Sequence, residues 1–483
     1  MKKMFTKLFS AVLLTGLTVI GFTAKAQSTS LADGAQTVTT ASASTADTKT
    51  DKTIDQKTKA KAKAEAQADD KMAAKVAADP DTAWKPQRRL WGYAFGDEYF
   101  DSHSPGVSVP QGKENNYYQV PSYRNAFQFR RLYLGYDYEI SKKFKAEVLL
   151  ASEPTANTGV NGSTSIQGSD NLVDGKMGFF IKNFNIRTRD LWKGTDFVIG
   201  ELSTPGFALN EPGTNAPTSL SETTWSYRSV ERTITDFHKN NSFDVGASLQ
   251  GTFDPTTKNY GYVLMVSNNS AASLLNASNP NSGFYKIFYG DIWGKFANNH
   301  IYADFYYHTA RSNAATAAIG GQGNSMYKIF AAYVSRPFNM GVEAYTQTFV
   351  NGVIDNGPVG ATGAPKVVQN ATVNGLSIWV RGAIYPTLNY FAKFDNYNPN
   401  TDFVGTDSYS VNAGPATYGA YDPYTKEHFT TFGLDFNPIP NVHFMPNIWY
   451  IQYIDNNTPT VTGYVPNNHT LVYRFTFFFT FGK

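Results

Sequence analysis

The sequence contains no cysteine. This absence excludes a disulfide framework, a thiolate metal site and a lipid anchor on an amino-terminal cysteine. Charged residues are also few, 17% of the chain against about a quarter in average proteins. Beyond residue 27 no stretch approaches twenty consecutive apolar residues, and the mean hydropathy is −0.36. These two features exclude a protein that crosses a membrane with helices.

The amino terminus has the pattern of a secretory signal. Lysines precede an apolar run at 8–22, and the small-residue pattern Ala24-Lys25-Ala26 follows it. Residues 1–26 are therefore predicted to be a signal peptide that is cleaved after Ala26. The apolar run is too short, and too interrupted by Thr and Gly, to predict a membrane helix.

Residues 27–83 are rich in Ala, Thr, Ser, Lys and Asp and have almost no large apolar side chain. Such a segment cannot form a hydrophobic core, so we expect a periplasmic tether that is disordered or partly helical. A trimeric coiled coil is the alternative. Ile54, Met72 and Val76 do not form the sustained heptad seam that it requires.

Aromatic residues make up 15% of the chain, with 30 Tyr and 35 Phe. From Trp84 onward the sequence consists of short segments in which apolar or aromatic residues alternate with polar ones. Alternation with a period of two predicts strands with one apolar and one polar face. The carboxy-terminal strand is typical, because its apolar side chains at 471, 473, 475, 477, 479 and 481 share one face. The sixteen predicted strands are 89–99, 125–140, 143–153, 176–189, 196–203, 242–253, 259–268, 284–296, 300–311, 325–335, 339–350, 375–385, 387–397, 427–436, 441–454 and 469–482.

The links between these segments alternate in length. Every link from an even-numbered to an odd-numbered strand is short, such as Pro386 alone, and every link from an odd-numbered to an even-numbered strand is long, such as 204–241. This layout is typical of an outer-membrane β-barrel with short periplasmic turns and long external loops. Residues 84–483 are therefore predicted to form an all-β, antiparallel transmembrane barrel of sixteen strands. A barrel of this size leaves an aqueous lumen, which indicates a porin for small hydrophilic solutes or ions.

Charged residues on the polar faces of the strands are predicted to face this lumen. A charge that faced lipid near the bilayer midplane would cost about 2–4 kcal/mol for Arg or Lys. The alternative for each of them is a structural ion pair or simple solvation. The predicted wall residues are Arg131, Lys145, Arg381, Lys393, Asp395 and Arg474, and the same parity places Lys143, Glu147, Lys328 and Glu343 on the wall.

Four segments in the same order along the chain resemble the phosphate-selective porin O/P family, in particular its Bacteroidetes porin-like branch. They are Phe127–Leu150, Asp196–Phe207, Glu222–Phe237 and Tyr390–Asn400. The resemblance covers about residues 88–483. It implies a sixteen-stranded homotrimeric diffusion channel with an inward-folded third loop, and a preference for anions or phosphate if the lumen is basic.

The third external loop, 204–241, carries charges of both signs. If it folds into the lumen, its charges could face one another across a constriction, where fixed charges set ion preference. The alternative is that they pair with one another or with the wall to hold the loop. These residues are Arg228, Arg232, Lys239, Glu222, Glu231 and Asp236.

Other functions find little support in the sequence. The seven His are scattered without a zinc-binding spacing, and His308 beside Ser312 is the only local pair that could suggest a lipase. Outside residues 1–83 there are 30 basic and 30 acidic residues, so bulk charge does not favour nucleic acid. We expect no enzyme activity, metal or cofactor, and lipid and solutes as partners. A non-conducting barrel whose loops bind a ligand or partner is the second hypothesis.

Overall fold

The computed structural model describes residues 84–105, 120–152, 179–207, 233–238, 242–268, 285–311, 321–335, 337–361, 363–411, 423–457 and 468–482. The predicted signal peptide 1–26 and tether 27–83 lie outside these residues, so both stay predictions. None of the described helices is long and apolar enough to cross a membrane.

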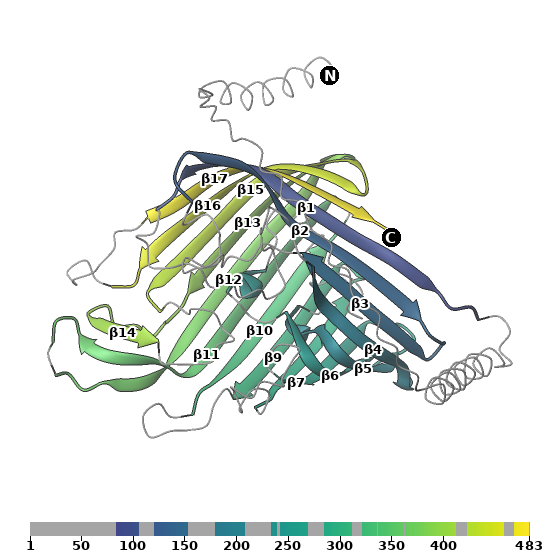
Figure 1. Cartoon of the computed structure of the whole chain (residues 1–483), viewed down its shortest axis with the longest axis horizontal. Helices are drawn as coiled ribbons and strands as arrows, with labels where there is room; N and C mark the ends of the chain where they lie inside the picture. Colours follow the sequence, from purple (N-terminus) through teal and green to yellow (C-terminus); the bar gives the residue numbers. More distant parts are fainter. Residues whose placement is uncertain are drawn as a thin grey trace, which may run out of the picture. The chain divides into compact units, whose positions relative to one another are not determined.

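Sixteen antiparallel strands form a closed barrel (Figure 1). The prediction of sixteen strands is confirmed, and each predicted segment overlaps one barrel strand. The strands are β1 (Arg88–His103), β2 (Arg124–Glu139), β3 (Phe144–Ser152), β4 (Phe180–Trp192), β5 (Thr195–Ser203), β6 (Phe243–Thr252), β7 (Tyr260–Ser267), β8 (Ile287–Phe296), β9 (Ile301–Arg311), β10 (Gly323–Val334), β11 (Phe338–Pro358), β12 (Val367–Tyr385), β13 (Leu388–Asn398), β15 (Thr425–Ile439), β16 (Val442–Asp455) and β17 (Asn468–Phe481).

The barrel closes between its first and last strands. β1 pairs with β17 from Gly92 opposite Phe481 to His103 opposite Leu471, and β1 also pairs with β2. Every backbone edge of the barrel is therefore paired, as a sheet in lipid requires.

The two faces of each strand differ as the alternation predicts. On β10, Tyr327 and Ile329 are half exposed on the outer face, whereas Met326 and Lys328 are buried on the inner face. β17 follows the same rule, with Tyr473, Phe475 and Phe479 outward and Arg474 inward. An apolar, aromatic outer surface around a polar interior is the arrangement that a bilayer favours.

One predicted loop is wrong. Residues 351–374 were expected to be an irregular external loop, but β11 and β12 continue through most of this range as a long hairpin. The short strand β14 (Asp407–Val411) pairs with the outer part of β11, so three strands extend past the barrel (Figure 1). Val353, Ala371 and Tyr409 form a small core there, and burial raises the pKa of Tyr409. A local core is what allows these strands to persist beyond the barrel wall.

Candidate functional site: the barrel interior

The first described part of the third loop lies inside the barrel, against the wall next to the loop's own strands. The turn η3 (Pro205–Phe207) follows β5 and contacts β7, β8 and β9. The Gly206 carbonyl accepts a hydrogen bond from the Lys328 ammonium group on the inner face of β10. This end of the loop is therefore fixed by an inward-facing charge.

The last described part of the loop contacts the next stretch of the inner wall. The short helix α4 (Ile234–Phe237) contacts β12, which is six strands away from β6 around the barrel. The Thr235 hydroxyl donates to Glu343 Oε1 on β11 at 3.1 Å, and the His238 ring stacks on Tyr397 of β13. The two described parts thus contact neighbouring stretches of the wall, β7 to β10 and β11 to β13, on the same side of the barrel.

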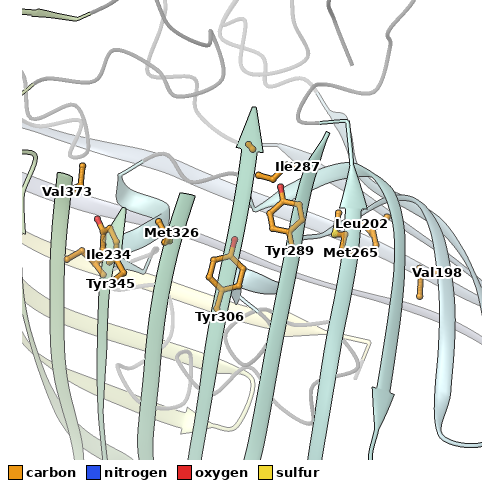
Figure 2. Close-up of a cluster of buried hydrophobic side chains, with 11 residues drawn as sticks. Val198, Leu202, Ile234, Met265, Ile287, Tyr289, Tyr306, Met326, Tyr345 and Val373 are labelled. Carbon is orange, nitrogen blue, oxygen red and sulfur yellow. The ribbon is translucent and has the colours of Figure 1, made fainter. Parts of the chain in front are cut away.

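An apolar cluster surrounds Ile234, which is fully buried. Figure 2 shows Ile234 on α4 beside Tyr345 and Met326, with Tyr306 and Tyr289 on the neighbouring strands. Burying a side chain of this size stabilises the docked loop by roughly 1.5–3 kcal/mol. The cluster therefore acts as an apolar anchor for the loop inside an otherwise polar interior.

Most of the predicted constriction residues cannot be placed. Glu222, Arg228, Glu231, Arg232 and Lys239 lie outside the described residues. Asp236 lies in α4, and its side chain is also outside what the structure describes. Their role in a constriction stays a prediction.

A buried carboxylate that the sequence reasoning missed binds several side chains on the inner wall. Asp97 of β1 accepts hydrogen bonds from Arg474 Nη2 at 2.6 Å and Thr476 Oγ1 at 2.5 Å on β17. It also accepts from Arg130 Nη1 and Gln128 Nε2 on β2, both at 3.1 Å. One buried carboxylate therefore links the three strands at which the barrel closes. The alternation of β1 would have placed Asp97 inward.

A second group of charges lies on β2 to β5, toward the short turns. Lys145 Nζ is 2.6 Å from Glu147 Oε1 and 3.5 Å from Asp137 Oδ2. Arg187 Nη1 is 3.2 Å from Asp196 Oδ2. These partners join neighbouring strands, which supports the structural alternative for Lys145 and Glu147.

The remaining predicted wall residues also have partners. Lys393 pairs with Asp395, and Arg381 Nη2 lies 3.3 Å from Asp435 Oδ2, which His443 also contacts. Arg131 Nη1 donates to the Tyr133 hydroxyl at 2.9 Å. Lys143 is different: it lies in the exposed turn before β3 and not on the wall, so that placement was wrong.

The buried charges of the described wall are mostly acidic. Eleven Asp or Glu are buried there, against six Arg or Lys, while Lys145 and Arg381 are only partly buried. The even overall charge of the sequence concealed this imbalance. A wall of this composition does not by itself favour anions.

The lipase possibility is not supported by the position of His308. A lipase of this class would need its His on the outer wall, but His308 faces the interior of β9, where Tyr306 contacts its Nδ1 at 2.7 Å. Ser312 lies outside the described residues.

Comparison with solved structures identifies the fold. The outer-membrane channel DcaP of Acinetobacter baumannii superposes with a TM-score of 0.50 at 8% identity, over 82% of this chain and 97% of that one. The anion-selective porin of Comamonas acidovorans, at 10% identity, gives a TM-score of 0.48 over 82% of this chain and 100% of that one. Neither the family models nor the curated proteins searched contain a match. The chain therefore has the porin-like fold, a closed sixteen-stranded barrel.

Proposed function

We propose that the chain forms an outer-membrane channel for passive diffusion of small hydrophilic solutes or ions, with the third loop as its constriction. The observation that carries this proposal is the closed barrel with a third loop docked inside it, whose described parts bind the inner wall at Lys328 and Glu343. A segment docked on the inner wall takes up part of the lumen and narrows it. The predicted signal peptide and the apolar outer surface support a place in the outer membrane.

Planar-bilayer recording of the purified protein tests the channel. We expect discrete conductance steps after insertion. Because a misfolded sample would also be silent, folding is first established by the shift in gel mobility between unheated and heated samples. Folded, inserted protein without conductance steps would contradict the proposal.

A preference for anions or phosphate, which the family resemblance implies, is the finer part of the proposal. The acidic excess on the described wall weighs against it, while the loop residues Arg228, Arg232 and Lys239 could supply positive charge at the narrowest point. The sign of the reversal potential under a KCl gradient decides whether the acidic wall or the basic loop residues determine the ion preference. A potential of the sign expected for chloride supports anion preference, and the opposite sign excludes it.

The homotrimer is a further part of the proposal that also comes from the resemblance. An SDS-resistant band of about three times the monomer mass, lost on heating, is expected. A folded protein that runs only as a monomer, before and after mild crosslinking, would contradict it.

A plugged barrel is the second candidate, and one observation favours it. Inward charged groups such as Lys328, Lys393 and Arg474 are almost completely buried, which indicates a crowded interior. A plugged barrel would produce no swelling of liposomes in small sugars, whereas an open channel would.

A further inference from the structure

Four charged side chains form a diagonal series on the inner faces of β8 to β11. Asp291 on β8 and Lys328 on β10 both lie opposite Tyr306 of β9, and Asp304 lies two residues before Tyr306. Glu343 on β11 lies opposite the residue two positions beyond Lys328. Diagonal neighbours in a sheet are about 7–8 Å apart, so each charge is within electrostatic range of the next. Three carboxylates therefore share the surroundings of one ammonium group.

These carboxylates have oxygens without partners. Among the described residues, no donor bonds either oxygen of Asp291, Oδ1 of Asp304 or Oε2 of Glu343. All three residues are more than nine-tenths buried, with exposed fractions of 1%, 6% and 0%. Lys328 contacts the Gly206 carbonyl as well. Buried carboxylate oxygens are costly unless a donor satisfies them, so the cluster calls for a donor that the described residues do not provide.

The geometry favours one class of donor. No group of three acidic, His or Cys side chains in the described residues is arranged to hold a metal ion, which argues against a chelated cation. An ammonium group is a compact cation with three N–H donors, so it can satisfy oxygens on separate strands at once. The Tyr306 ring, over which Lys328 already lies at 5.7 Å, adds a face that attracts cations.

We propose that Asp291, Asp304 and Glu343 form a binding subsite for a primary ammonium group of a basic solute. The ligand class is set by the excess of carboxylates and by their unpaired oxygens. The subsite rests on the proposed function in one respect, because the ligand reaches it through the lumen. It lies beside the docked loop, since Glu343 binds Thr235 and Lys328 binds Gly206.

Calorimetric titration of the folded protein in detergent with putrescine, a primary diamine, tests the subsite. We expect saturable binding that weakens at least tenfold in the Asp291→Asn/Asp304→Asn variant. Glu147→Gln is the matched control, because it removes an inward carboxylate that already has a lysine partner, and it should bind within twofold of the unchanged protein. Choline, a cation without N–H donors, should bind at least tenfold more weakly than putrescine.

Each result decides the matter. No saturable putrescine binding to folded protein, or equal binding by the double variant, would overturn the proposal and indicate that these carboxylates are protonated. Equal affinity for choline would overturn the ammonium assignment. Because binding is measured without a membrane, conductance without binding overturns only the subsite. Binding without conductance overturns only the channel.

Discussion

Asp97 shows how a single residue closes this barrel. Its carboxylate binds Arg474 and Thr476 on β17 and Arg130 on β2, and the Arg474 guanidinium lies 4.0 Å from the Trp449 ring centroid. Two buried guanidinium groups thus share one carboxylate. Removing one partner of a buried ion pair typically costs about 3–5 kcal/mol, because a charge remains buried without that partner.

Asp97→Asn is therefore expected to destabilise the barrel by roughly 3–5 kcal/mol. Urea unfolding in detergent, followed by tryptophan fluorescence, measures the change. Asp402→Asn is the control, because Asp402 is exposed in the external region. An Asp97→Asn midpoint equal to that of the control would show that the carboxylate does not hold the closure.

Glycine on the outer face of β1 makes room for aromatic rings of the last strand. A Cβ added to Gly96 would lie 2.5 Å from Phe477 Cζ and 2.5 Å from the Gln128 carbonyl oxygen. The carbonyl cannot move aside without breaking the strand pairing. Phe477 thus packs over the backbone at the closing seam, which explains one of the aromatic residues in the carboxy-terminal strand.

Gly96→Ala should destabilise the barrel by about 1–3 kcal/mol through overpacking. Gly290→Ala is a matched control in β8, because the nearest atom to its added Cβ is 3.9 Å away, in Leu264. It is expected to unfold at the same urea concentration as the unchanged protein, or slightly higher. If both variants unfolded alike, the contact with Phe477 would not be limiting.

At the scale of the elements, alternation predicted which strands exist and which side chains face inward. It failed where the backbone departs from a regular ladder. β2 has a bulge that turns both Arg130 and Arg131 inward, and a period of two predicts only one of them. The continuation of β11 and β12 depends on contacts with β14, which no local pattern contains. The docking of α4 depends on an apolar cluster assembled from distant strands.

The docked loop gives a prediction at this scale. Ile234→Ala removes most of the side chain that anchors α4, a change that typically costs about 2–5 kcal/mol in a packed site. The loop should leave the wall more often, so single-channel conductance should rise and fluctuate more. Ile292→Ala, on the exposed outer face of β8, is the control and should leave the conductance unchanged. Identical traces for both variants would show that α4 does not limit the pore.

At the scale of the whole molecule, ion preference depends on the sum of the charges along the interior. Lys393 is one of six buried cations among eleven buried carboxylates, and its removal takes away a positive charge but leaves its partner Asp395 in place. Lys393→Ala is therefore expected to shift the reversal potential under a KCl gradient toward potassium. Arg232→Ala should shift it in the same direction if Arg232 lines the constriction. Lys143→Ala provides the matched control, because the same type of charge lies in the exposed turn before β3. An equal shift for Lys143→Ala would mean that only the overall charge matters, and no shift for Lys393→Ala would remove Lys393 from the residues that determine selectivity.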